Sequence, residues 1–339
     1  MESVAAVPAP ARRFVQFDIY GVGLKISSSS PELLDNLARD FGYFEATPTG
    51  SVVSVEGVLA TPPWERVPVD FANQVTPNAL IFDRGSVRFN DYHHEALAIY
   101  DFAREEGEVW SENPDLLYEV VYLLCLSRVG ELHDLRRIHR IHALGIAIGG
   151  KGALVLLPEG GGKSTLCMEM LRHPEVQILS DDTPLISRGK MLAFPTRVGL
   201  RQGGDAIDPR YLRIMRRRNR EPKTLIDIEY FRDRLVHEAD PAAVIIGARR
   251  NGDESWIDPI GAMKALPTLA ANLVFGLGLP QVVEFFLRSG ASEAVGKVRI
   301  AGYRLSAALG LARHAKCYRL ALGRDVAAAA NAIKSVLRS

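Results

Sequence analysis

Short stretches of alternating apolar and polar residues dominate the first part of the chain, a pattern typical of half-buried β-strands. Residues 14–27 alternate around two glycines and predict a pair of strands. Ser30 precedes a proline and a glutamate and predicts a helix N-cap, with apolar residues following on one face. Strand-like runs then follow at residues 51–59, 79–82 and 86–89. We therefore predict a small α+β domain over residues 14–115, after a flexible tail at residues 1–13.

A different pattern begins with a strongly apolar helix predicted at residues 115–131. Continuous apolar runs at residues 143–148 and 153–157 predict two buried strands joined by a glycine-rich turn. The second strand runs into more glycines and then into a helix that starts near Lys163, and another strand is predicted at residues 177–179. Strand, glycine loop, helix and strand in this order are typical of α/β nucleotide-binding domains. We therefore assign residues 116–339 to one such domain.

The remainder of this second domain is less sharply patterned. Helices are predicted at residues 263–288, 292–312 and 325–337, and strands at residues 242–248 and 318–322. The run from Arg210 to Lys223 holds seven cationic residues and one acidic residue. This basic run is either a docking surface for an acidic peptide or protein, or a solvated loop. Because Tyr211 is its one aromatic residue, it does not favour a nucleic-acid site.

Composition limits the classes of protein to which the chain belongs. The 339 residues are 47% apolar and 24% charged, with a formal net charge of +1, which is ordinary for a soluble globular protein. These values exclude disordered and collagen-like chains and indicate no general attraction to nucleic acid or anionic membranes. Three scattered cysteines without a CxxC pair indicate a reducing compartment and no zinc site. Without a good membrane span or a secretory signal, we expect a cytoplasmic protein.

The sharpest motif lies between the second buried strand and the helix that follows it, and consists of Gly160, Gly161, Gly162, Lys163, Ser164 and Thr165. Glycines can adopt positive φ, so successive backbone N–H groups can turn inward around an anion. The helix directs its free amides and the positive end of its dipole at the same point. The lysine can reach the β- and γ-phosphates, and the serine hydroxyl can ligate Mg²⁺. The motif predicts a nucleotide-binding P-loop; the alternative is a glycine-rich turn without a ligand.

The loop departs from the full GxxxxGK[ST] pattern in two places. Leu157 stands where the pattern has its first glycine, and Glu159 places a carboxylate beside the expected phosphates. The loop is therefore either shorter than usual or turns at residues 158–159 instead. A loop changed in this way could also bind nucleotide without turning it over.

Two adjacent carboxylates, Asp181 and Asp182, follow the next predicted strand, and Asp181 lies eighteen residues after Lys163. In an open α/β sheet, the carboxyl ends of such strands point into the same crevice as the P-loop. One carboxylate could hold Mg²⁺, and the other could accept a proton from an attacking hydroxyl. Away from a P-loop, the same pair would be interpreted as turn or helix-capping residues.

Three stretches carry a family resemblance: IHALGIAIGGKGALVLLPEGGGKSTL, ILSDDTPLI and AFPTRVGLR. They resemble the HPr kinase/phosphorylases and the related HPr-kinase-like serine kinases, over about 60 residues. Residues 1–115 do not visibly resemble the regulatory domain of HPr kinases. They are more similar to the leader region of divergent HPr-kinase-related proteins from peptide-tailoring gene clusters, such as those for lasso peptides. The resemblance implies an α/β P-loop kinase domain of the HPr kinase/PEP carboxykinase-like kind, preceded by the small α+β domain.

The resemblance also implies roles for the motif residues. Lys163 and the amides of residues 160–164 would bind the phosphates, with Thr165 completing the motif. Ser164 and Asp182 would hold Mg²⁺, and Asp181 would be the base for a substrate hydroxyl.

A family histidine falls on His142, fifteen residues before Leu157. It would lie near the transferred phosphate; the alternative is a satisfied core histidine. His139, three residues earlier, is more consistent with a structural role. Phosphoryl transfer also needs cations that neutralise developing charge, and the candidates are Arg249, which we take as catalytic, with Arg250, and the pair Arg197 and Arg201.

We predict a kinase that uses ATP and Mg²⁺ to phosphorylate a Ser or Thr hydroxyl of a peptide or small protein. In the peptide-tailoring relatives that acceptor is the precursor peptide. The alternatives are a small-molecule kinase, a nucleotide-binding regulatory protein without turnover, and a phosphorylase that runs the reverse reaction. The resemblance further implies a homo-oligomer, and we expect no nucleic-acid or membrane partner.

Overall fold

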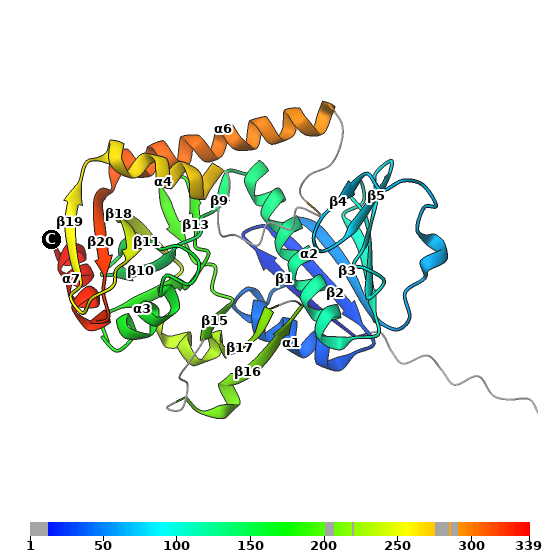
Figure 1. The fold of residues 1–339 in the computed structure, drawn as a ribbon, viewed down its shortest axis with the longest axis horizontal. Helices are drawn as coiled ribbons and strands as arrows, with labels where there is room; N and C mark the ends of the chain where they lie inside the picture. The colour runs from blue at the N-terminus through cyan, green and yellow to red at the C-terminus, as the bar shows by residue number, and fades with distance from the viewer. Residues whose placement is uncertain (1–12, 201–206, 219, 275–284, 286–290) are drawn as a thin grey trace, which may run out of the picture. The chain divides into compact units, whose positions relative to one another are not determined.

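The computed structural model describes residues 13–200, 207–218, 220–274, 285 and 291–339 (Figure 1). The chain is a mixed α/β protein with several sheets and divides into two compact units. The first unit comprises Met1–Val129 and Arg217–Asn219, and the second comprises Gly130–Arg216 and Arg220–Ser339. The predicted tail lies outside the described residues except for Arg13, which begins the first strand.

An eight-stranded sheet with the order β1-β2-β3-β8-β7-β6-β5-β4 forms the first unit. Its strands are β1 Arg13–Ile19, β2 Val22–Ser28, β3 Ser51–Leu59, β4 Gln74–Val75, β5 Leu80–Arg84, β6 Val87–Asp91, β7 Ala96–Asp101 and β8 Glu106–Ser111. β2 pairs in parallel with β3, and β3 with β8, whereas the other neighbours are antiparallel. The predicted strand pair is confirmed as β1 and β2, and the three predicted runs as β3, β5 and β6.

Two of the strands missed by the sequence analysis, β7 and β8, follow these runs. β7 is buried at five of its six positions. A strand buried on both faces has no alternation of apolar and polar residues, so its periodicity resembles that of any short apolar run.

The helical elements of the first unit are α1 Pro31–Phe41, the 3-10 helices η1 Gly42–Phe44 and η2 Trp64–Arg66, and most of α2 Pro114–Leu135. The predicted cap is confirmed, because the side chain of Ser30 accepts a hydrogen bond from the Leu33 amide at 3.4 Å. Helix α1 packs on β1 and β2. The Phe41 ring lies 5.5 Å from the Phe17 ring and 5.6 Å from the Tyr122 ring of α2, so both helices share one core with the sheet.

Strand β18, the longest strand described, is the centre of the second unit. The sheet around it contains β9 Ile138–Arg140, β10 Leu144–Ile148, β11 Lys151–Leu156, β12 Gln177–Ser180, β13 Leu185–Ser187, β14 Lys190–Leu192, β18 Glu238–Arg249, β19 Trp256–Ile260 and β20 Lys316–Leu322. β18 pairs in parallel with β11 and β20. β10 is antiparallel to both β11 and β12. The carboxyl ends of β11 and β12 therefore lie at the same edge of the sheet.

The helices of this unit are α3 Lys163–Met170, α4 Ala262–Val274, α6 Ala291–His314 and α7 Val326–Arg338. Helices α3 and α7 pack against each other and against β10, whereas α4 and α6 pack together and contact β18 and β20. Figure 1 shows these two pairs on opposite sides of the sheet. The helix predicted at residues 263–288 is confirmed as far as Val274, and most of its remainder lies outside the described residues.

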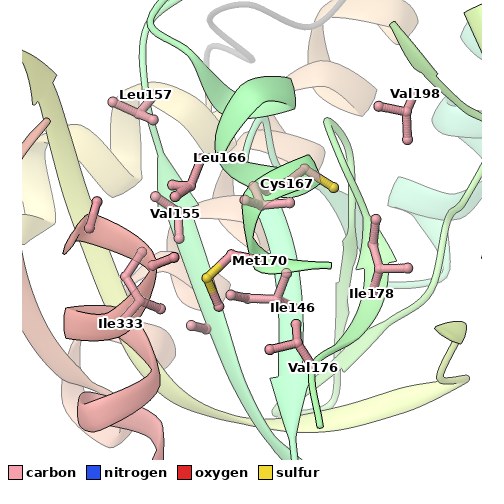
Figure 2. Close-up of a cluster of buried hydrophobic side chains, with 14 of the residues drawn as sticks. Ile146, Val155, Leu157, Leu166, Cys167, Met170, Val176, Ile178, Val198 and Ile333 are labelled. Atoms are coloured by element: carbon pink, nitrogen blue, oxygen red, sulfur yellow. The ribbon is translucent and has the colours of Figure 1, made fainter. Parts of the chain in front are cut away.

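A hydrophobic core fills the space between the sheet and helices α3 and α7 (Figure 2). It includes Ile146, Val155, Leu157, Leu166, Cys167, Met170, Val176, Ile178, Val198 and Ile333. Burying one such aliphatic side chain contributes roughly 1.5–3 kcal/mol relative to leaving it exposed. Leu166, Cys167 and Met170 anchor α3 in this core. The first residues of the helix therefore lie at the edge of the sheet.

The loop part of the solvated-loop alternative is wrong, because the basic run forms strands, although Arg210, Arg216 and Glu221 are exposed. A three-stranded sheet has the order β15-β17-β16, with β15 Arg197–Leu200, β16 Leu212–Arg217 and β17 Arg220–Asp227. The 3-10 helices η3 Pro209–Tyr211 and η4 Ile228–Arg234 flank it. Met215 of β16 is buried, and the Arg213 guanidinium contacts the Asp227 carboxylate at 2.8 Å. Burial of apolar residues and this ion pair tie the run to the fold.

A buried ion pair joins the end of α2 to α6. The Arg304 guanidinium donates from Nε to Asp134 Oδ1 at 3.0 Å and from Nη2 to Asp134 Oδ2. His139 Nδ1 lies 2.8 Å from the same carboxylate. All three side chains are almost fully buried, so the group has a structural role.

Replacing Asp134 with asparagine will destabilise the second unit by about 3–5 kcal/mol, because the Arg304 charge stays buried without its counter-ion. Urea unfolding followed by circular dichroism measures the loss. The matched control is Asp253→Asn, because Asp253 pairs with Arg324 on the surface and such pairs contribute little. Equal losses in the two variants would contradict the prediction.

All three cysteines are free and buried. Burial raises the pKa of the Cys125 and Cys167 thiols, so neither is a reactive thiolate. None of the described helices is both long enough and apolar enough to span a bilayer.

Candidate active site

The loop between β11 and α3 turns at its proline. The Gly161 amide donates to the Pro158 carbonyl at 2.9 Å, which is the second of the two loop geometries considered from the sequence. Gly160 and Gly162 have φ values of 73° and 100°, a region that residues with a Cβ rarely adopt. Gly162 is the N-cap of α3. The first-turn amides of α3 have no intrahelical acceptor and face this loop, as an anion site requires.

Leu157 does not disturb the loop, although it replaces a glycine of the usual pattern. Its side chain is 3% exposed, belongs to the core and occupies the space over Gly247 of β18. Its carbonyl accepts a hydrogen bond from Lys163 Nζ at 2.9 Å. The side chain therefore points into the core, and the backbone holds the lysine.

Lys163, the first residue of α3, is 7% exposed and reaches two further groups. Its Nζ lies 2.7 Å from His142 Nε2 and 3.9 Å from Asp182 Oδ1. Burial lowers the pKa of Lys163, against the opposing charges of the two aspartates. An ammonium has no acceptor, so His142 Nε2 accepts and the ring proton is on Nδ1. Burial lowers the pKa of His142 as well, which is consistent with a neutral ring.

The position of His142 is set by two backbone hydrogen bonds that pair its segment with the one after β12. The Ala143 amide donates to the Asp182 carbonyl at 2.9 Å, and the Ile141 amide donates to the Pro184 carbonyl at 3.2 Å. This pairing brings His142 Nδ1 to 3.2 Å from Asp182 Oδ1. The Asp182 side chain is 44% exposed, so one of its faces is open to a ligand.

Asp181 occupies a different environment from its neighbour. It follows the end of β12, is 8% exposed, and accepts a long hydrogen bond of 3.5 Å from Ser164 Oγ. The Gly199 amide of β15 also donates to it. Burial raises the pKa of Asp181 to about 7, the charge of Asp182 adds to the rise, and Lys223 is the largest opposing influence. Adjacent carboxylates in unlike environments are suited to different roles.

Asp181→Asn will make the protein more stable above pH 7. The folded state holds a proton on Asp181 up to about pH 7, whereas the ordinary pKa is 3.8. Between these two values, the folded state binds a proton that the unfolded state has lost, so stability falls as pH rises. The cost above pH 7 is at most about 4 kcal/mol. Urea unfolding across this pH range, with a chelator present, will show a flatter profile for the variant than for the wild type. Parallel stability–pH profiles for Asp181→Asn and the wild type would contradict the prediction. The control is Asp240→Asn, at an exposed aspartate, which should keep the wild-type profile.

The predicted arginines fall in different places. A Cβ on Gly162 would lie 3.4 Å from Arg249 Nη1, so Arg249 lies beside the glycine loop. Arg250 instead stacks over the Trp256 ring at 4.5 Å. Arg197 begins β15 opposite Asp227. Arg201 lies outside the described residues, and Thr165 is on the exposed side of α3.

Lys223 is a site residue that the sequence analysis placed in the basic run without a site role. Strand β17 carries it, and its side chain crosses the bare backbone of Gly199 in β15. Its charge acts on both Asp181 and Lys163. No local motif marks this lysine, because the pairing of β15 with β17 alone brings it here.

The residues present fit Mg²⁺ bound together with a phosphate. Within the part of the chain that the structure describes, no group of three or more His, Cys, Asp or Glu residues is arranged to hold a metal by itself. Mg²⁺ usually keeps several waters and takes one or two carboxylates plus substrate phosphates. Ser164, Asp181 and Asp182 supply a hydroxyl and two carboxylates at the mouth of the loop, which is a donor set of that kind.

Comparison with solved structures gives partial likenesses, of which the following is one. The structure is similar to the HPr(Ser) kinase/phosphatase from Coxiella burnetii, at 17% sequence identity and a TM-score of 0.20. The matched region covers 32% of this chain and 65% of that chain. No protein-family model and no curated protein sequence matches the chain.

Proposed function

We propose that this protein is a phosphotransferase that uses ATP and Mg²⁺ to phosphorylate a hydroxyl group. The observation that carries the proposal is the position of Lys163. It begins α3 behind a glycine loop, and its Nζ lies 2.7 Å from His142 and 3.9 Å from Asp182. A buried lysine, a helix N-terminus and two carboxylates around one point are the groups that phosphoryl transfer requires.

The loop and Lys163 would bind the nucleotide phosphates. The amides of residues 160–164 would donate to phosphate oxygens, and Lys163 would exchange its bond with the Leu157 carbonyl for the β- and γ-phosphates. Arg249, beside Gly162, would neutralise charge on the transferred group. His142 would orient Lys163 through Nε2 and Asp182 through Nδ1.

Asp181 would be the general base and Asp182 a metal ligand. A carboxylate with a pKa near 7 can take a proton from a hydroxyl at neutral pH. The more exposed Asp182, with Ser164, would hold Mg²⁺, which supplies positive charge to the β- and γ-phosphate oxygens when bound. As Asp181 takes the hydroxyl proton, the acceptor oxygen bonds to the γ-phosphorus, the bond to the bridging oxygen breaks, and ADP leaves.

The acceptor that we propose is a Ser or Thr side chain of a peptide or small protein. Two observations support it. The motif stretches resemble HPr-kinase-like serine kinases, and the basic run forms strands β16 and β17, of which β17 carries Lys223. A small-molecule hydroxyl would use the same phosphate site.

The test combines calorimetry with transfer of a labelled phosphate. Wild-type protein is titrated with ATP and Mg²⁺ and then incubated with γ-labelled ATP and a cell extract, whose products are separated by size. Label in a peptide or protein supports the proposal, and label in a small molecule favours a small-molecule kinase. ATP binding without any transfer indicates a nucleotide-binding regulatory protein. No ATP binding would overturn the P-loop assignment.

A further inference from the structure

The end of the Lys223 side chain occupies the space beside Gly199 in which any other residue would place its Cβ. Strands β15 and β17 are antiparallel, with Leu200 opposite Thr224 and Gly199 opposite Leu225. Lys223 is thus the diagonal neighbour of Gly199, within reach for a long side chain. A Cβ on Gly199 would collide with Lys223 Cε and Nζ. The φ of Gly199 is not in the left-handed region, so a Cβ here would displace the end of the lysine side chain rather than strain the backbone.

The end of this side chain lies close to Asp181. The amide of Gly199 donates to the Asp181 carboxylate, and the Lys223 ammonium lies against the same glycine. Lys223 is partly buried, and the end of its side chain packs on the backbone of Gly199 in β15.

The charges of two lysines, Lys163 and Lys223, both lower the pKa of Asp181. Lys163 approaches from α3, and Lys223 approaches from β17. The two ammonium groups repel each other, and the charge of Lys223 accordingly lowers the pKa of Lys163. An anion held between them would remove this repulsion. Arg213 in the same basic run is neutralised by Asp227 at 2.8 Å, so this cation is not available to the site.

We propose that Lys223 binds the terminal phosphate of the nucleoside triphosphate, and that Gly199 is required because it leaves room for this lysine. The proposal rests on the proposed function. The α3 N-terminus and Lys163 hold the phosphates nearest the loop. Lys223 lies at Asp181, the base, which is where the γ-phosphate must be for transfer. A cation at this point would contact the γ-phosphate, which ATP has and ADP lacks.

The experiment compares ATP with ADP by isothermal titration in Mg²⁺. Lys223→Met keeps the length of the side chain and removes its charge. Gly199→Ala keeps the charge and displaces it. Arg210→Gln changes an exposed cation of the same basic run that stacks on Tyr211. We expect the first two variants to weaken ATP binding about 10- to 100-fold, as for the loss of a charge-assisted hydrogen bond. ADP binding should change by no more than about twofold, and Arg210→Gln should bind both like the wild type.

ADP is the internal control for folding, because a damaged site would lose both nucleotides. Equal losses for ATP and ADP, or unchanged ATP binding in Lys223→Met, would overturn the role of Lys223 and leave the proposed function in place. If wild-type protein binds neither nucleotide, the proposed function fails and this inference fails with it. A loss in Lys223→Met without a loss in Gly199→Ala would overturn the role given to Gly199.

Discussion

Asp181→Asn will lower the rate of phosphoryl transfer by about 10³-fold, the usual contribution of a general base, while ATP binding in Mg²⁺ stays close to that of the wild type. The amide keeps the size of the side chain and still accepts from the Gly199 amide, but it cannot take the proton of the acceptor. Single-turnover transfer of γ-labelled phosphate measures the rate, and calorimetry measures the binding.

The matched variant is Asp182→Asn, which makes the same chemical change one residue away. Asp182 is more exposed and lies beside His142 and Lys163. Its loss should raise the Mg²⁺ concentration that half-maximal activity requires, whereas Asp181→Asn should leave that concentration unchanged. If the two variants exchange these behaviours, Asp182 is the base and Asp181 is the metal ligand.

Lys163→Met will weaken ATP binding more than about 100-fold, because the variant loses the buried cation that meets the phosphates. Methionine retains most of the packing volume, so the helix should keep its place. Unlike Lys223→Met, this change should weaken the binding of both ATP and ADP, since the β-phosphate that Lys163 would contact is present in both nucleotides.

Lys151→Met is the control, because Lys151 is an exposed lysine on the strand before the loop. It should bind ATP like the wild type. Unchanged ATP affinity in Lys163→Met would show that the glycine loop is not a phosphate site, and the roles proposed for Asp181 and Lys223 would then fall with it.

Local features of the fold were visible in the sequence wherever one short stretch carried its own signal. The β1–β2 hairpin alternates over its whole length, and Ser30 caps α1 through an amide three residues away. The glycine loop needed only the apolar strand before it and the helix after it. Strands without such signals were missed, and β7 is the clearest case because both of its faces are buried.

The charges of the basic run did not reveal that it forms the paired strands β16 and β17, or that Arg213 is neutralised by Asp227. Charge along a sequence does not tell which side chains are neutralised, because the partners come from elsewhere in the chain. Asp227, for example, pairs with Arg213 from the neighbouring strand.

By itself, the sequence determined the glycine loop before α3, the lysine and serine that follow it, and the presence of two carboxylates after the following strand, because these groups are close along the chain and each local conformation follows from residue type. Only the tertiary structure decided how the two carboxylates differ and which cations reach them. Burial of Asp181, the exposure of Asp182 beside His142, and the passage of Lys223 over Gly199 all depend on strands that pair across long separations in sequence. The electrostatics of a site follow from distances and from the exclusion of water, and both are properties of the folded chain.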